Sequence, residues 1–478
     1  MPKITLLGAG SGFTQPLFTD MLHIEGIEKG VIGLVDIDEK RLGINVKLIE
    51  RILGLMGKTG WTVEASSDRK KILPGTDYLI STIEVSGTQC VRWDNDIPME
   101  YGIDQCIGDT IGPGGVMKAL RTLPPLLEIL ADAERLCPQA LVMNYTNPMS
   151  IITQGATRSS TLPFVGLCHS VQGSWRQVAR AAGIPDEKMD QVKWRCAGIN
   201  HLAWYTEMTY RGRDIYPDAI AGIEDPAIYE NDPVRYEMMR QFGYFVTESS
   251  GHFSEYVPYF RKRKDLLKTY CRDGYRGGSS FYADNWPDWR KATDKRRRAM
   301  ANGKEEIALR RSHEYAADIV EAHHFHRPTV IHASAPNNDL VTNLPRDGVV
   351  EVAVLVDRNG YTPTHFGDLP EQCAALDRAH MAVYKLCADG ILHQDREALI
   401  HAMMLDPLSA AVCSPAEIRE MAEKLFAAEK RYIPAWAAKK PKARRKPRKA
   451  AGRGKRRKAA TTDAAAEVSS MAARNVQK

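Results

Sequence analysis

Short runs of apolar residues alternate with longer stretches in which apolar residues recur every three or four positions. Residues 14–24 and 39–56 show the second pattern, which indicates amphipathic helices. The short runs, which indicate buried strands, lie at residues 3–7, 31–35, 77–82, 141–144 and 163–167. Strands that alternate with helices are typical of a doubly wound parallel sheet. We therefore predict an α/β domain of Rossmann type over residues 1–194.

A different pattern follows this domain. Residues 194–199 and 204–210 are predicted to form antiparallel strands, and residues 374–404 and 415–428 are predicted to be helical. Helices and strands are mixed here without regular alternation. This indicates a second domain of α+β type over residues 195–436.

The C-terminal end differs from both domains in composition. Residues 437–478 are rich in Lys, Arg, Ala and Pro, so we predict a disordered tail. Residues 439–458 alone hold 13 Lys or Arg and no acidic residue, and the formal charge of +6 therefore comes from the tail. Such a segment could bind polyanions non-specifically through counterion release, or it could be a solvated extension without a partner.

Composition also limits where the protein is expected to act. No apolar stretch approaches the roughly 20 residues that span a bilayer, and the N-terminus lacks the features of a signal peptide. The nine cysteines are scattered and odd in number, which argues against a disulfide framework. We expect a cytoplasmic protein that does not enter the membrane.

A glycine-rich loop follows the first predicted strand. Residues 8–12 are Gly-Ala-Gly-Ser-Gly, and glycines there allow backbone N–H groups to approach a pyrophosphate. Phe13 occupies the position where a third glycine is usual. Asp36 ends the second strand, where a carboxylate binds ribose hydroxyls and favours NAD over NADP. The alternative is a glycine-rich turn without a ligand. The predicted cofactor-binding residues are Gly8, Gly10, Ser11, Gly12, Phe13 and Asp36.

Two further residues follow predicted strands and could share a metal ion. Cys168 comes directly after residues 163–167, and His201 follows residues 194–199. A thiolate and an imidazole are both ligands for divalent metals, but a buried cysteine and a hydrogen-bonded histidine are more common than a ligand pair. These two residues alone leave both interpretations open.

At this point the chain resembles a known family, the NAD- and metal-dependent glycoside hydrolases of family 4. The resemblance covers roughly residues 1–430. Its motifs are GAGSG (8–12), VDIDEKRL (35–42), GDTIGPGG (108–115), NYTNP (144–148), CHSVQG (168–173), GINH (198–201), SEYVPYFRKR (254–263) and PNNDLVTNLP (336–345). The resemblance implies a Rossmann domain followed by an α+β domain, as in lactate and malate dehydrogenases.

The residues after the cysteine distinguish subgroups of this family. Cys-His-Ser-Val, from Cys168 to Val171, resembles the α-galactosidase type, whereas phospho-sugar members tend to have Cys-Asn or Cys-Asp. The resemblance therefore implies hydrolysis of α-galactosides. Alpha-galacturonidases and α-glucuronidases are close to this type and remain the alternative.

The family mechanism implies transient oxidation of the sugar. Bound NAD takes hydride from C3, a base removes the C2 proton, and the glycosidic oxygen leaves from C1. Water then adds, and the hydride returns to C3, so that no net oxidation occurs. A divalent metal, Mn²⁺ in most members, acts as a Lewis acid at O2 and O3.

The motif matches imply roles for individual residues. Cys168 and His201 are the expected metal ligands. Tyr256 matches the base, and its pKa would have to be lowered by the metal or by the nearby Arg261 and Arg263. The general acid is either Asp109 or His169, and an aspartate would need burial to raise its pKa. The residues expected to contact substrate are Asn147, His169 and Asn200.

Two other functions remain to be distinguished. A 2-hydroxy-acid dehydrogenase would share the fold and would consume NAD in proportion to product. A nucleic-acid-binding protein would depend on the basic tail. The resemblance also implies a homodimer or homotetramer.

Overall fold

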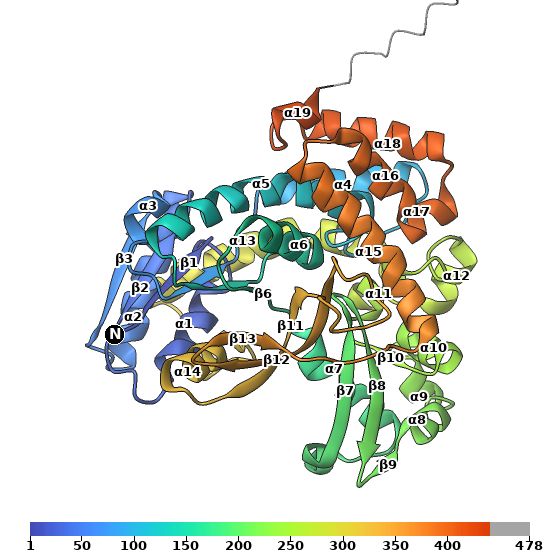
Figure 1. Cartoon of the computed structure of the whole chain (residues 1–478), viewed down its shortest axis with the longest axis horizontal. Coiled ribbons are helices and arrows are strands. Elements are labelled where there is room, and N and C mark those ends of the chain that lie inside the picture. The colour runs from blue at the N-terminus through green and yellow to red at the C-terminus, as the bar shows by residue number, and fades with distance from the viewer. Residues whose placement is uncertain (440–478) are drawn as a thin grey trace, which may run out of the picture. The chain divides into compact units, whose positions relative to one another are not determined.

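In the computed structural model, which describes residues 1–439, one mixed sheet runs through the protein. Its parallel half contains, in sheet order, β6 (Phe164–Gly166), β5 (Leu141–Asn144), β4 (Tyr78–Ser81), β1 (Lys3–Leu7), β2 (Gly30–Val35) and β3 (Trp61–Ser66). The predicted doubly wound α/β fold is confirmed, and Figure 1 shows these strands in blue and teal. The edge strand β3 was not predicted, because most of its side chains are exposed or half-buried.

The antiparallel half continues the same sheet. It contains β11 (Thr329–Pro336), β12 (Val349–Asp357), β7 (Val192–Ile199), β8 (Leu202–Tyr210) and β10 (Phe245–Val246), with β13 (Gly360–Pro363) beside β12 and β9 (Arg213–Asp214) beside β8. The predicted antiparallel pair β7–β8 is confirmed. Hydrogen-bonded strands thus connect the two predicted domains, and the boundary at residues 194/195 stays a prediction.

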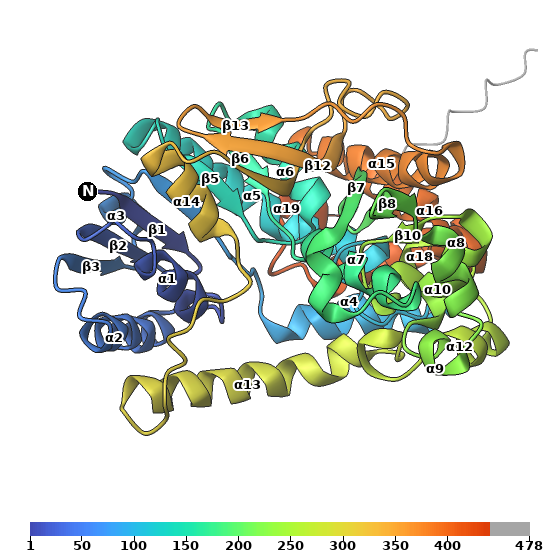
Figure 2. The same ribbon diagram turned by 90° about the horizontal axis from the view of Figure 1, so that it is seen from below.

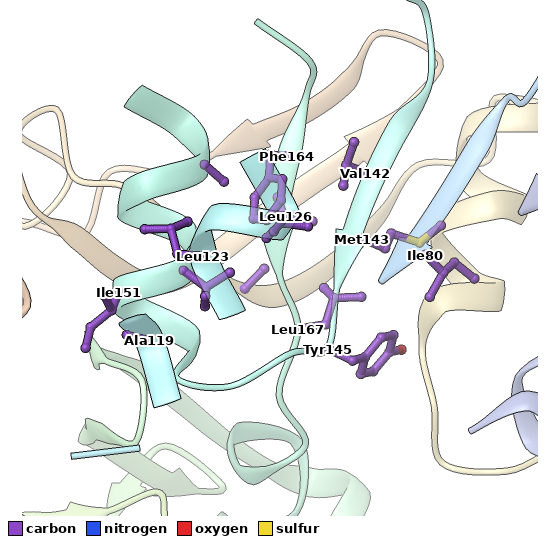
Figure 3. Close-up of a cluster of buried hydrophobic side chains, with 14 of the residues drawn as sticks. Ile80, Ala119, Leu123, Leu126, Val142, Met143, Tyr145, Ile151, Phe164 and Leu167 are labelled. Atoms are coloured by element: carbon purple, nitrogen blue, oxygen red, sulfur yellow. The ribbon is translucent and has the colours of Figure 1, made fainter. Parts of the chain in front are cut away.

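Helices cover both faces of the parallel half. The helices of the first half of the chain are α1 (Thr14–Leu22), α2 (Glu39–Leu55), α3 (Arg69–Ile72), α4 (Thr88–Glu100), α5 (Gly112–Leu136), α6 (Met149–Ser159) and α7 (Ser170–Ala181), of which α7 packs against the antiparallel strands β7 and β10. The long helix α5 was not predicted, because it contains Gly-Pro-Gly-Gly at its start and Pro124-Pro125 in its middle. Its side chains Leu123 and Leu126 pack with Val142 and Phe164 in the buried cluster of Figure 3. This cluster anchors the strands that precede the site.

The remaining helices belong to the second half of the chain. They are α8 (Tyr216–Gly222), α9 (Pro226–Tyr229), α10 (Pro233–Phe242), α11 (Ser250–Tyr256), α12 (Lys264–Tyr270), α13 (Phe281–Ala301), α14 (Ala316–Phe325), α15 (Glu371–Leu392), α16 (Arg396–Leu405), α17 (Pro407–Val412), α18 (Pro415–Ala428) and α19 (Ala435–Ala438). Helix α13 returns to the first half and runs beside α2 (Figure 2). Within the described residues, no helix has the length and apolarity that a membrane span requires.

Two predicted boundaries need correction. The segment 374–404, which is predicted to be helical, is divided into α15 and α16, because Gln394 is left-handed (φ +56°) and the Asp395 side chain caps α16. The predicted tail begins too early, since α19 extends past residue 437 and Ala437 is buried. The rest of that tail, residues 440–478, lies outside the described residues.

Candidate active site

The glycine loop lies between the end of β1 and the start of α1. Gly8 has φ +79°, and a Cβ there would come within 2.6 Å of the Thr82 carbonyl oxygen, so only glycine fits. The Gly10 N–H donates to the Asp36 carboxylate at 2.6 Å, and the Asp38 N–H donates to the same side chain at 2.8 Å. Asp36 therefore lies against the loop at the end of β2, as the sequence predicted.

Phe13 links the glycine loop to the candidate catalytic residues. It is the N-cap residue of α1, without a side-chain hydrogen bond. Its ring stacks on the His169 ring with a centroid separation of 6.4 Å and contacts the Tyr145 ring at 5.4 Å. The side chain in place of the third glycine thus packs at the border between the loop and the site.

Three potential metal ligands converge beside this loop. Cys168 follows β6, His201 lies in the turn between β7 and β8, and Glu248 follows β10. One ligand atom from each side chain lies within 4.8 Å of those of the other two. The structure thus brings the predicted pair together and adds a carboxylate that the sequence analysis missed. Thr247-Glu248 carries no local signal, since nothing in the sequence indicates that β10 ends beside β8.

The charges around this cluster suit a cation. Burial opposes ionisation of Glu248, but the His252 and His201 rings outweigh it and hold the carboxyl pKa below its ordinary value. Burial, with Glu248 nearby, raises the pKa of the Cys168 thiol. The His201 Nε2 atom lies 3.4 Å from the Glu248 carboxylate. A divalent ion would remove the cost of ionising the thiol in this acidic surrounding.

Tyr256 ends helix α11 with its side chain buried against the cluster. Its hydroxyl lies 3.4 Å from His201 Nδ1. Burial raises its pKa well above the ordinary value. The predicted help from two arginines is wrong, because Arg261 donates to Asp104, Ser254 and Gly277, and Arg263 pairs with Asp265. Of the influences named from the sequence, only a metal remains to lower the pKa of Tyr256.

Asp109 is buried, but its surroundings have the opposite effect to the one expected. Its carboxylate accepts a hydrogen bond from Lys118 Nζ at 2.9 Å, and the same ammonium lies 3.3 Å from Glu84. Burial alone would raise the Asp109 pKa, but the Lys118 charge outweighs it, with help from His252, so the pKa is lowered. Asp109 is therefore a poor proton donor at neutral pH in this arrangement.

His169 is the N-cap residue of α7, and its side chain is half-exposed. Its Nε2 atom lies 2.5 Å from the Glu314 carboxylate. The hydrogen bond to Glu314 raises the pKa of the imidazole, which favours a protonated ring. Glu314 was not anticipated, because 145 residues separate it from His169 in the sequence.

Asn147 and Asn200, the two asparagines predicted to contact substrate, each have a side-chain oxygen that is unpaired in the described part of the chain. The side-chain oxygens of Asn147 and Asn200 are buried, and neither has a hydrogen-bond partner among the described residues. The turn before Pro148 is made by Asn144, whose side-chain nitrogen donates to the Thr146 carbonyl oxygen and whose side-chain oxygen accepts from the Thr146 N–H. The Asn200 amide nitrogen donates to Glu351 at 3.3 Å. Both oxygens are free to accept from a ligand hydroxyl.

Comparison with known proteins agrees with this geometry. The model of the family 4 glycosyl hydrolases matches residues 3–184, and the model of the C-terminal domain of family 4 glycosyl hydrolases matches residues 196–409. The chain belongs to family 4 of the glycosyl hydrolases. The enzymes of this family cleave glycosidic bonds. The family resemblance that the sequence motifs indicated is confirmed.

Individual relatives cover nearly the whole chain. An α-galactosidase of Bacillus subtilis (strain 168) is 36% identical over 91% of this chain and 99% of the relative. An α-galactosidase of Rhizobium meliloti (strain 1021) is 33% identical over 91% and 90%. An α-galacturonidase of Lachnoclostridium phytofermentans is 28% identical over 90% and 97%.

Solved structures support the fold. The 6-phospho-β-glucosidase of Thermotoga maritima, solved with manganese, NAD⁺ and glucose-6-phosphate, superposes with a TM-score of 0.73 at 20% identity. The match covers 90% of this chain and 99% of that one. At this identity the likeness shows the fold alone.

Proposed function

We propose that this family 4 enzyme is an α-galactosidase that acts with bound NAD and a divalent metal, Mn²⁺ by preference. The observation that carries the proposal is the cluster of Cys168, His201 and Glu248 at the same sheet edge as the glycine loop. The two α-galactosidases described above, at 33% and 36% identity, support the substrate class.

The side chains fit both groups. Thiolate, imidazole and carboxylate are ligands that divalent transition metals accept, and three protein ligands leave positions for sugar oxygens. The Gly8 backbone and the Asp36 carboxylate fit the diphosphate and a ribose of NAD. When bound, NAD supplies reversible hydride acceptance and the metal supplies Lewis acidity at the sugar hydroxyls.

The chain's own residues move the protons in this proposal. Tyr256, beside His201, is positioned to take the proton from C2 of the sugar as the phenolate, which a bound metal would stabilise. His169 is the proposed donor to the leaving oxygen, because its ring is half-exposed at the site and the alternative carboxylate, Asp109, is engaged by Lys118. Lys118 and Asp109 together hold a fixed pair of charges near the imidazoles.

The sugar itself would be oriented by neutral groups. The free side-chain oxygens of Asn147 and Asn200 accept hydrogen bonds from sugar hydroxyls, so that burying them with substrate removes two unsatisfied acceptors. The Asn200 side-chain nitrogen donates to the Glu351 carboxyl group, which fixes the orientation of the amide. This lining suits an uncharged hexose.

The experiment combines substrate and isotope. The protein is incubated with an aryl α-galactoside, NAD, Mn²⁺ and a thiol in D₂O, and an aryl α-galacturonide is run in parallel. We expect faster hydrolysis of the galactoside, deuterium at C2 of the released sugar and no net NADH.

The outcomes separate the alternatives. Faster cleavage of the galacturonide would show that the enzyme is an α-galacturonidase, and the proposed mechanism would stand. NADH formed in proportion to product would establish a dehydrogenase instead. Hydrolysis that persists unchanged after NAD and metal are removed would contradict the proposal altogether. Assembly into a dimer or tetramer stays a prediction, which sedimentation velocity would test.

A further inference from the structure

Helix α13 contacts the glycine loop through hydrogen bonds from a charged side chain. Arg297 is 5% exposed, and its guanidinium donates to the Gly10 carbonyl oxygen at 2.5 Å and to the Ser11 carbonyl oxygen. Asp294, one turn earlier, pairs with Arg297 and with Arg41 of α2. A helix far away in the sequence therefore forms one wall of the dinucleotide loop, and Figure 2 shows it running alongside α2.

Arg290 lies on the same face of α13, four residues before Asp294 and seven before Arg297. Its guanidinium approaches the backbone of Gly87 in the loop after β4, where a Cβ would lie 3.4 Å from Nη1. Arg290 is half-buried, and within residues 1–439 it has neither a hydrogen bond nor an ion pair.

Within residues 1–439, the carboxylates of Glu84, Asp294 and Asp36 attract Arg290, but none of them forms an ion pair with it, and Glu84 lies 3.3 Å from Lys118. Arg41 and Arg297 share the single carboxylate of Asp294. Asp36 already accepts two backbone N–H groups. Burial and the neighbouring Arg41 lower the pKa of Arg290. A half-buried guanidinium in this position is unfavourable unless an anion binds beside it.

The position of Arg290 indicates which anion fits. The β4 loop and the glycine loop follow adjacent strands, and a dinucleotide diphosphate lies at the glycine loop in this fold. The ribose end is set by Asp36 on the far side, at β2. We propose that Arg290 binds the diphosphate of the dinucleotide. Helix α13 would thereby contribute a side chain from the second half of the chain to the cofactor site. The inference rests on the proposed use of NAD.

Nucleotide affinity tests the proposal directly. Dissociation constants of NAD, NADP and ADP are measured by calorimetry for the wild type, Arg290→Ala and Arg290→Lys. A charge-assisted hydrogen bond contributes enough that Arg290→Ala should weaken all three ligands by about 10- to 100-fold and by similar factors. Arg290→Lys should fall between, because it keeps the charge but not the planar fork.

Lys291→Ala is the matched control. It removes the neighbouring cation, whose side chain is 79% exposed, and should leave all three affinities unchanged. Thermal unfolding supplies a second readout. Without nucleotide, Arg290→Ala should unfold at the same or a higher temperature than the wild type, since a repelled charge is removed. The stabilisation by saturating NAD should be smaller.

Three outcomes would overturn the inference. Equal NAD affinity for the wild type and Arg290→Ala would sink it and leave the proposed function intact. A loss confined to NADP would assign Arg290 to a 2′-phosphate instead. A wild-type chain that binds ADP but not NAD would contradict the proposed function itself, whatever Arg290 does.

Discussion

The parallel and antiparallel halves of the sheet contribute different groups to the site. On the parallel side the glycine loop offers backbone, shaped by the positive φ of Gly8 and by the Gly10 N–H against Asp36. On the antiparallel side, His201 and Glu248 offer side chains from strand ends that are neighbours only in the fold, and these meet Cys168, which follows the last parallel strand, β6. A backbone site depends on conformation, and a side-chain site depends on ligand chemistry. Substitutions should therefore affect cofactor and metal separately.

The strongest test of this separation is Cys168→Ser. Loss of the thiolate should weaken Mn²⁺ binding by more than about 100-fold, because even outer-shell changes cost 10- to 100-fold. NAD affinity should stay within about twofold, as no backbone of the loop is altered. Metal affinity is measured by electron paramagnetic resonance of free Mn²⁺. Cys413→Ser, at a cysteine away from the site, is the control. Unchanged Mn²⁺ affinity in Cys168→Ser would remove the thiol from the ligand set.

Glu248→Gln tests the ligand that the sequence analysis missed. The amide keeps the shape of the side chain but removes its charge, so we expect Mn²⁺ affinity to fall by about 10- to 100-fold. NAD affinity should not change. Glu224→Gln, whose side chain is 70% exposed, controls for the loss of one negative charge. An equal loss of Mn²⁺ affinity in both variants would mean that Glu248 acts only through the net charge of the protein and is not a metal ligand.

Gly8→Ala tests the backbone side. The added Cβ would meet the Thr82 carbonyl oxygen in a left-handed conformation, which costs about 1–3 kcal/mol of unfolding free energy. NAD affinity should fall about tenfold for a strain of this size, while Mn²⁺ affinity is retained. Gly43→Ala in α2, where a Cβ would meet nothing within 4 Å, should be neutral or stabilising in urea unfolding. Loss of metal binding in Gly8→Ala would show that the two sites are coupled.

The smallest expected effect concerns Glu351, which lies on β12 of the antiparallel half. Burial, with Cys168 nearby, raises its pKa to about 8 from the ordinary 4.5. The folded chain thus keeps a proton that the unfolded chain releases, and stability is lost as the pH rises from about 4.5 to 8. Relative to the wild type, Glu351→Gln should gain about 1 kcal/mol of unfolding free energy between pH 6 and pH 7.

This difference is measured by urea unfolding in EDTA, so that no metal contributes. Glu207→Gln, at an exposed carboxylate of β8, should give a curve parallel to that of the wild type. Parallel curves for Glu351→Gln as well would mean that Glu351 is ionised in the folded chain.

The parts of the fold that local patterning encodes were predicted well. Strands β1, β2, β4 and β5 are buried apolar runs, and periodicity is enough to identify them. The exposed edge strand β3 and the helix α5 with its prolines lack that signal, and tertiary packing decides their structure. The break between α15 and α16 depends on one left-handed residue and one cap.

The candidate site divides in the same way. Cys168 and His201 could be predicted because each follows a strand within a recognisable motif. The Lys118 contact with Asp109 and the Glu314 contact with His169 could not, and they change which residue is the proposed acid. Arg290 approaches the β4 loop only because α13 returns to pack on α2.

By itself the sequence determined the alternation of strands and helices, the glycine loop with Asp36, and the motifs of the family, because these are encoded in contiguous residues. The tertiary structure decided which distant side chains meet. Glu248 completes the metal cluster, Lys118 sets the charge of Asp109, and Arg290 lies beside Gly87 in the loop after β4. Their roles depend on distances of a few ångströms between segments more than a hundred residues apart in some cases, which no local pattern records.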